Sequence, residues 1–164
     1  MSDVVRVRYA EVDDWQSVRE TRLAALADAP HAFGSTLARE VAFDDQEWQR
    51  RIHDNDWFLA WSGQRPVGVV AGVHESGHRD RRHLTAMWVH PDHRGTVAAT
   101  DLVEAVCDLA MLQGATLVIL RVADTSPRAR AFYERRGFRT TGQRGSLPSA
   151  PEIGEELLQR YLEA

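Results

Sequence analysis

The stretch HLTAMWVHPDHRGTVAATDLVEAV (residues 83–106) passes from a strand pattern to a helix pattern with no polar linker between them. Apolar residues alternate up to a His-Pro pair, and Leu102, Val103 and Val106 then recur at helical spacing. Gly95 permits backbone angles that other residues avoid. The first N–H groups of a helix lack intrahelical acceptors, so they favour anions, and Arg94 adds charged donors. The junction therefore suits a diphosphate ligand, or it is a tight connection that needs one glycine.

Chain length and charge set the broad class of protein. A chain of 164 residues is long enough for one well-buried core, so we expect a single domain over residues 1–164. The formal net charge of −4 argues against a general nucleic-acid binder, and we read the basic run RDRRH (79–83) as a solvated loop. No run of residues is long and apolar enough to span a bilayer. We expect a cytoplasmic protein with neither nucleic acid nor membrane as a partner.

Hydrophobic periodicity predicts an α/β fold. Its first half is mostly strands and hairpins, and from residue 94 onward helices and strands alternate. The single cysteine, Cys107, falls at an apolar helical position and is read as buried filler. We expect strands over 4–9, 57–61, 67–75, 83–89, 116–122, 138–143 and 155–162, the last also compatible with a helix. We expect helices over 15–29, 46–54 and 128–136, and a further helix that includes 102–110 and is stopped by Gly114.

Four segments together resemble a known family. MWVHPDHRG, LAMLQGA, LVILRV and SPRARAFYERRGFRTTG are similar, in order and spacing, to the acetyl-CoA-binding core of the GNAT family of N-acetyltransferases. The resemblance spans about residues 83–142 and is weaker in the N-terminal half. It implies a GNAT-like α/β sandwich, with a mixed, mostly antiparallel sheet of about six to seven strands flanked by about four helices.

The resemblance also implies where acetyl-CoA binds. In the family, the strand before the loop pairs its exposed backbone with the pantetheine arm, and the loop amides hold the pyrophosphate. The matching residues of this chain are Met87, Trp88 and Val89 for the strand, Arg94, Gly95, Thr96, Val97, Ala98, Ala99 and Thr100 for the loop, and Ser126 at the next helix start.

Two of these positions depart from the family pattern. Glycine is usual where this chain has Val97, and a β-branched side chain is bulky against a diphosphate. Many relatives have asparagine where this chain has Ser126, whose hydroxyl is shorter but can cap a helix. These departures motivate an alternative function, a non-catalytic acyl-CoA sensor or regulatory module.

Tyr133 and His83 are the candidate catalytic residues. The resemblance matches Tyr133 to the tyrosine that protonates the departing thiolate, although an aromatic on a buried helix face could also be packing. His83 could take a proton from the amine, because two-residue periodicity puts positions 83, 85, 87 and 89 on one face unless a bulge intervenes. Glu75 is a rival base. A histidine that merely ends a basic turn is the alternative.

The acceptor is expected to be an amine on a small molecule or peptide. In the family, the helix-loop-helix after the first strand forms one wall of its site, which here makes Phe33, Ser35 and Glu40 the candidates; an ordinary packed loop is the alternative. His90 and His93 lack further ligands at metal spacing, so no metal is expected. A homodimer is left open.

Overall fold

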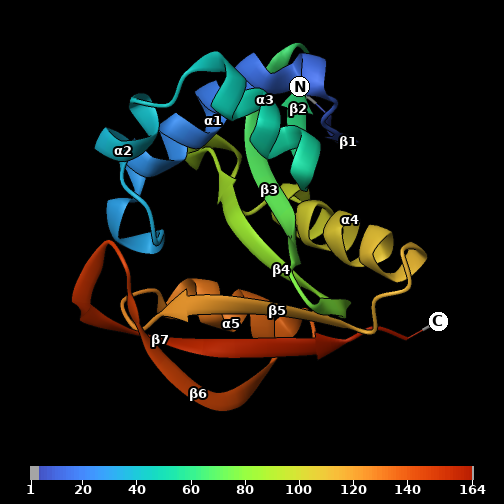
Figure 1. Cartoon of the computed structure of the whole chain (residues 1–164), viewed down its shortest axis with the longest axis vertical. Helices are drawn as coiled ribbons and strands as arrows, with labels where there is room; N and C mark the ends of the chain where they lie inside the picture. Colours follow the sequence, from blue (N-terminus) through green and yellow to red (C-terminus); the bar gives the residue numbers. More distant parts are fainter. Residues whose placement is uncertain (1–3, 164) are drawn as a thin grey trace.

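The computed structural model describes residues 4–163 and shows a mixed α/β fold (Figure 1). Short 3₁₀ turns, η1 (Val12–Asp14), η2 (Pro30–Ala32) and η3 (Pro91–His93), connect some of the elements. The main elements are β1 (Val5–Tyr9), α1 (Trp15–Asp28), α2 (Leu37–Val41), α3 (Asp45–Asp54), β2 (Asp56–Ser62), β3 (Arg65–Glu75), β4 (His78–Val89), α4 (Ala98–Leu112), β5 (Leu117–Ala123), α5 (Pro127–Arg135), β6 (Arg139–Leu147) and β7 (Ala150–Tyr161).

Across the described residues, seven strands form one sheet in the order β1-β2-β3-β4-β5-β7-β6. Every neighbouring pair is antiparallel except β4 and β5, which are parallel. The predicted mixed, mostly antiparallel sheet is therefore confirmed. The segment 155–162, which could also have been a helix, lies almost entirely in β7, between β5 and β6.

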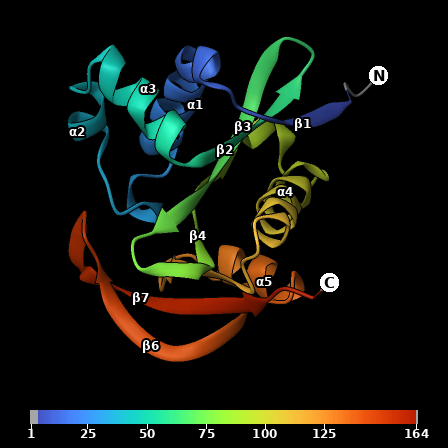
Figure 2. The same ribbon diagram turned by 45° about the vertical axis from the view of Figure 1, so that its right-hand side comes forward.

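The pairing between β4 and β5 is unusually short. It covers only Arg81–His83 of β4 against Leu117–Ile119 of β5, whereas β5 pairs with β7 along its whole length. Beyond His83 the two strands diverge and the sheet splits into two halves, as Figures 1 and 2 show. The edge of β4 that faces β5 is thus left without a strand partner beyond His83.

A bulge in β4 changes which side chains share a face. Ala86 has a φ of 59°, and the register with β3 shifts between Val69 and Ala71. Leu84 and Val89 consequently pack in one hydrophobic cluster, while Trp88 packs with Ala86 in the other. The expectation that positions 83, 85, 87 and 89 share a face is wrong, because the extra residue of the bulge reverses the alternation.

The two hydrophobic clusters lie on opposite faces of the sheet. One joins α4 and α5 to the sheet through residues such as Leu102, Cys107 and Phe138, and it confirms Cys107 as buried filler. Burial also raises the pKa of the Cys107 thiol to about 12. The other cluster lies under α1 and α3 and contains Val18 and Ile52. The sheet is therefore covered by helices on both faces, as predicted.

Two local predictions need correction, those for the run 79–83 and for the side chain of Ser126. Asp44 caps α3 by accepting a hydrogen bond from Glu47 N at 2.8 Å. The run 79–83 is not a loop but part of β4, because β4 pairs with both β3 and β5 there. The segment between α1 and α3 contains the short helix α2. Ser126 precedes α5, but its side chain makes no capping hydrogen bond.

Candidate functional site

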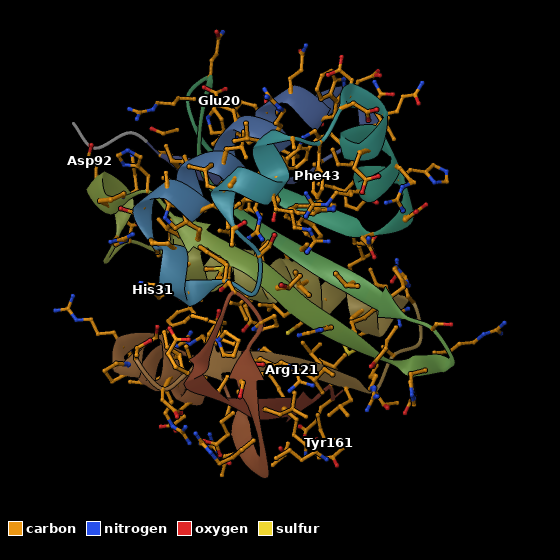
Figure 3. The ribbon with its side chains drawn as sticks, turned by 60° about the vertical axis from the view of Figure 1, so that its left-hand side comes forward. Glu20, His31, Phe43, Asp92, Arg121 and Tyr161 are labelled. Carbon is orange, nitrogen blue, oxygen red and sulfur yellow. The ribbon has the colours of Figure 1, made fainter. Side chains whose placement is uncertain are left out.

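A cavity of about 300 Å³ lies in the split between β4 and β5. Strands β4 and β5 form two walls, Tyr133 of α5 forms part of another, and the η2 segment and the β6–β7 turn approach from the remaining sides. In Figure 3, Arg121 lies on the β5 side of the split, and His31 lies on the η2 turn above it. The lining residues are Ala32, Phe33, Gly34, His83, Leu84, Thr85, Ala86, Met87, Leu120, Arg121, Ala123, Tyr133, Leu147, Pro148 and Glu155.

Tyr133 is held in this cavity by aromatic packing. Its ring lies 5.3 Å from that of Phe132 and 5.8 Å from that of Phe138, and only 8% of the residue is exposed. Within residues 4–163 its hydroxyl has no hydrogen-bond partner. Burial raises the pKa of Tyr133, so the phenol stays protonated at neutral pH. The cavity is thus lined by a phenol that is available as a proton donor.

His83 lines the same cavity at the point where β4 leaves β5. Burial lowers the pKa of His83, and the positive charge of Arg121 lowers it further. The imidazole is therefore neutral near pH 7 and has a free lone pair for a proton. Glu75 does not line the cavity. Its carboxylate accepts a hydrogen bond from Arg81 Nε at 2.5 Å, and its charge opposes the lowering of the His83 pKa. Two of the residues singled out from the sequence, Tyr133 and His83, are brought together.

Arg121 and Glu155 are cavity residues that the sequence analysis missed. Arg121 interrupts an otherwise apolar strand, and this interruption was the one available signal. Glu155 gave no such signal, because the segment 155–162 could not be assigned to strand or helix from its pattern. The cavity therefore contains one carboxylate and one guanidinium in addition to the predicted histidine and tyrosine.

The side chains at the end of β4 lie on both faces of the sheet. Met87 lines the cavity, but the Trp88 side chain is buried on the opposite face, where its indole donates a hydrogen bond to Asp28 at 3.0 Å. Arg94 Nε donates to the Val89 carbonyl at 3.1 Å, and its Nη2 pairs with Asp28 at 2.6 Å. The Trp88 hydrogen bond and then Arg94 keep the pKa of Asp28 below its usual range. Arg94 thus ties the loop to α1 and to the end of β4.

The loop from 95 to 100 has the geometry of an anion site at a helix start. Gly95 adopts a φ of 75°, and α4 begins at Ala98. Thr96 Oγ1 donates to the His93 carbonyl at 2.7 Å and accepts from Ala98 N at 3.2 Å, so one first-turn amide already has a partner. Val97 has an ordinary helical φ of −73° and is 62% exposed. Ala99 and Thr100 belong to the first turn, whose N–H groups lack intrahelical acceptors.

These features fit a long acyl-CoA ligand better than a compact one. The helix start offers backbone donors for a diphosphate, and the open edge of β4 offers backbone groups for amides of an extended arm.

Ser126 is partly buried at the start of α5, and it does not line the cavity. Its own N–H donates to the Ala123 carbonyl at 3.0 Å.

Of the three acceptor-site candidates, the cavity includes Phe33 only. The Phe33 carbonyl accepts a hydrogen bond from Ser149 Oγ at 2.6 Å. Ser35 and Glu40 line a different cavity of about 270 Å³ among the first three helices. Glu40 is 1% exposed and binds Arg22 and Arg51 at 3.0 Å each. Burial opposes ionisation of Glu40, but these two arginines hold the pKa of its carboxyl below the usual range.

No group of three or more His, Cys, Asp or Glu side chains with metal-site geometry occurs in the described part of the chain. His90 and His93 stand with their rings 6.2 Å apart, and His90 Nε2 lies 3.3 Å from Arg65 Nη2. Within residues 4–163 no helix combines the length and apolar character needed to cross a membrane.

Known proteins share this fold at low sequence identity. A GNAT-family acetyltransferase from Streptococcus pneumoniae has 16% identity and a TM-score of 0.79, with coverage of 98% of this chain and 100% of that chain. A proposed acetyltransferase, yncA from Salmonella typhimurium, was solved with its cofactor acetyl-CoA. It has 14% identity and a TM-score of 0.79, with coverage of 98% of this chain and 95% of that chain. The ribosomal-protein-S18-alanine N-acetyltransferase from Escherichia coli has 14% identity and a TM-score of 0.72, with coverage of 98% of this chain and 96% of that chain.

Two further comparisons concern the sequence itself. No curated protein sequence matches the chain at a significant level. The family model of the GNAT acetyltransferases matches residues 15–138, which include β4, the loop before α4, and α5. The chain therefore belongs to the GNAT acetyltransferase family.

Proposed function

We propose that this chain is a single-domain N-acetyltransferase that transfers the acetyl group of acetyl-CoA to a primary amine of a small molecule or peptide. The observation that carries the proposal is the cavity in the β4–β5 split. It places a neutral histidine, a protonated tyrosine and the open backbone edge of β4 around one space. Family membership and the neighbour solved with acetyl-CoA support the same cofactor for this chain.

In the proposed reaction, both substrates are bound together and the amine nitrogen attacks the thioester carbonyl carbon. Acetyl-CoA supplies the activated acyl group. His83 accepts the proton that the attacking nitrogen loses, and Tyr133 donates a proton to the sulfur as the carbon–sulfur bond breaks. Backbone N–H groups at the end of β4 polarise the carbonyl oxygen. The products are the N-acetylated amine and CoA with a free thiol.

A second candidate function is a non-catalytic acyl-CoA sensor, and the loop before α4 favours it. Val97 projects its isopropyl group from the surface where the pyrophosphate would lie, and Thr96 already occupies the Ala98 amide. In this alternative, acyl-CoA binds but no amine is acetylated. Cavity residues then position the acyl group without moving protons.

A screen of amines with acetyl-CoA separates the two functions. We expect acetyl-CoA to raise the melting temperature and at least one class of primary amine to release free thiol. The panel includes amino acids, polyamines, an aminoglycoside and peptides with free N-termini, the last because one structural neighbour is named for acetylating a protein alanine. A thermal shift without thiol release from any amine supports the sensor. Absence of both effects at millimolar acetyl-CoA rejects both functions.

Val97→Gly tests whether the loop restricts the cofactor. We expect tighter acetyl-CoA binding, because the exposed isopropyl group is removed while the amide of residue 97 remains a donor. Isothermal titration calorimetry measures the change in Kd. An unchanged or larger Kd would show that the loop is already adapted to valine.

Tyr133→Phe tests the proton donor. The ring and its packing are retained, so the melting temperature and acetyl-CoA affinity should stay near those of the wild type, and the hydroxyl has no partner in the described residues to lose. We expect single-turnover acetyl transfer to fall by roughly 10- to 1,000-fold. If the chemical step keeps its rate with an acceptor that the wild type acetylates, Tyr133 is not the general acid.

His83→Gln tests the proton acceptor. We expect the rate of acetyl transfer to fall by roughly 100-fold or more, with acetyl-CoA affinity unchanged. In the wild type, kcat/KM should decrease as the pH falls through a pKa below the ordinary 6.5, because only neutral His83 accepts a proton. This acidic limb should disappear in the variant. A limb that persists unchanged would assign the titration to another group.

A further inference from the structure

Glu155 is a buried carboxylate that the rest of the protein leaves without a partner. It pairs through its backbone with Ala123 of β5, and only 6% of the residue is exposed. Its carboxylate has no hydrogen bond or ion pair to any residue between 4 and 163. Its neighbour Glu156 points to the other face and binds Arg130 of α5 and Thr140 of β6. Burial raises the pKa of Glu155, and Arg121 opposes this shift.

Arg121 stands beside Glu155 on the same face of the sheet. It lies two residues before Ala123 on β5, so its side chain points to the cavity side as Glu155 does. A Cβ added at Gly145 would lie 3.7 Å from Glu155 Oε1 and 3.8 Å from Arg121 Nη1, so the two charged ends flank the same glycine. In the described part of the chain Arg121 has no ion pair, and the two groups are not bonded to each other.

Glu155 is the buried member of the two, whereas Arg121 is exposed, so the unfavourable burial concerns the carboxylate. A carboxylate that is removed from water without a partner is unfavourable, and such a group in a native protein requires an explanation, of which a bound ligand is one. The cavity offers one anion, one cation and a neutral imidazole from His83. Its volume of about 300 Å³ is at the lower end for a ligand site, so the acceptor that shares it with the acetyl group is small.

We propose that Arg121 and Glu155 recognise a zwitterionic acceptor, a free amino acid or a close analogue, and this rests on the proposed acetyl transfer. Glu155 holds the ammonium group beside His83, which takes a proton from it to give the neutral amine that attacks the thioester. Arg121 binds the carboxylate, for which its planar guanidinium is well suited. Phe33, Leu147 and Pro148 supply apolar surface for the side chain of the acceptor. A polyamine would place a second positive charge against Arg121, and a peptide N-terminus would present an amide where the carboxylate is needed.

The test compares matched acceptors with matched variants. Standard L-amino acids, their methyl esters and the corresponding decarboxylated amines are assayed with acetyl-CoA by thiol release, and binding of the same compounds is followed by thermal shift in the presence of CoA. The variants are Arg121→Gln and Glu155→Gln. Arg79→Gln, at an exposed arginine of β4, and Glu152→Gln, at an exposed glutamate of β7, are the controls.

We expect at least one amino acid to have a KM at least about tenfold below those of its ester and amine, the difference expected from one charge-assisted hydrogen bond or ion pair. Arg121→Gln should remove this preference by raising KM for the amino acid alone. Glu155→Gln should raise KM for all three compounds. Both controls should behave as the wild type, and Arg121→Lys should restore part of the preference because it keeps the charge.

Two results would overturn the proposal. One is a preference for polyamines, peptides or esters over free amino acids, and the other is an amino-acid preference that survives in Arg121→Gln. If no amine releases thiol, acetyl transfer fails and the binding assay decides on the site alone. A thermal shift with amino acids that is lost in both variants supports the zwitterion site, and no shift with any amino acid rejects it.

Discussion

The early end of the pairing between β4 and β5 is the constraint on which the site depends. After His83 the backbone of β4 has no neighbour on one side, and a free strand edge inside a sheet is normally avoided because its polar groups seek partners. In this protein the edge opens onto the cavity that holds Tyr133. The split thus creates both a space and a row of backbone groups that an extended ligand can pair with.

The bulge in β4 makes the split compatible with a packed interior. A left-handed conformation at a residue such as Ala86 costs roughly 1–2 kcal/mol, so the surrounding packing must hold it. That packing comes from Trp88 under the first helices and from Val89 against α4, which lie on opposite faces. Because Arg94 binds both the Val89 carbonyl and Asp28, it fixes the loop before α4 to the same two layers. Strand end, loop and α1 therefore form one connected unit.

The sequence predicted those parts of the protein whose cause is local. The helical spacing of Leu102, Val103 and Val106 indicated α4, and the resemblance in the segment around Tyr133 indicated both α5 and the role proposed for that residue. The bulge at Ala86 was not predictable, because β4 is covered on both faces and its apolar residues give no sign of a reversed alternation. Glu40 was predicted as a residue of the acceptor site, but it lines a different cavity. Its partners Arg22 and Arg51 are distant in sequence, so the sequence could not show that its carboxylate is buried in ion pairs.

The C-terminal hairpin shows how alternation along one strand separates two tasks. Glu156 lies on the α5 side of β7, where Arg130 of α5 and Thr140 of β6 bind it and lower the pKa of its carboxyl, so it contributes to holding the helix that carries Tyr133. Glu155 faces the cavity, where it lacks a partner among residues 4–163 and its pKa is raised. The two residues are identical in type and adjacent in sequence, and they differ only in the face of β7 to which they belong. Because β7 pairs with β5 along the whole of β5, its register fixes both positions. A shift by one residue in one direction would put Gly154 in the cavity in place of the carboxylate, and a shift in the other direction would put Leu157 at the position that binds Arg130.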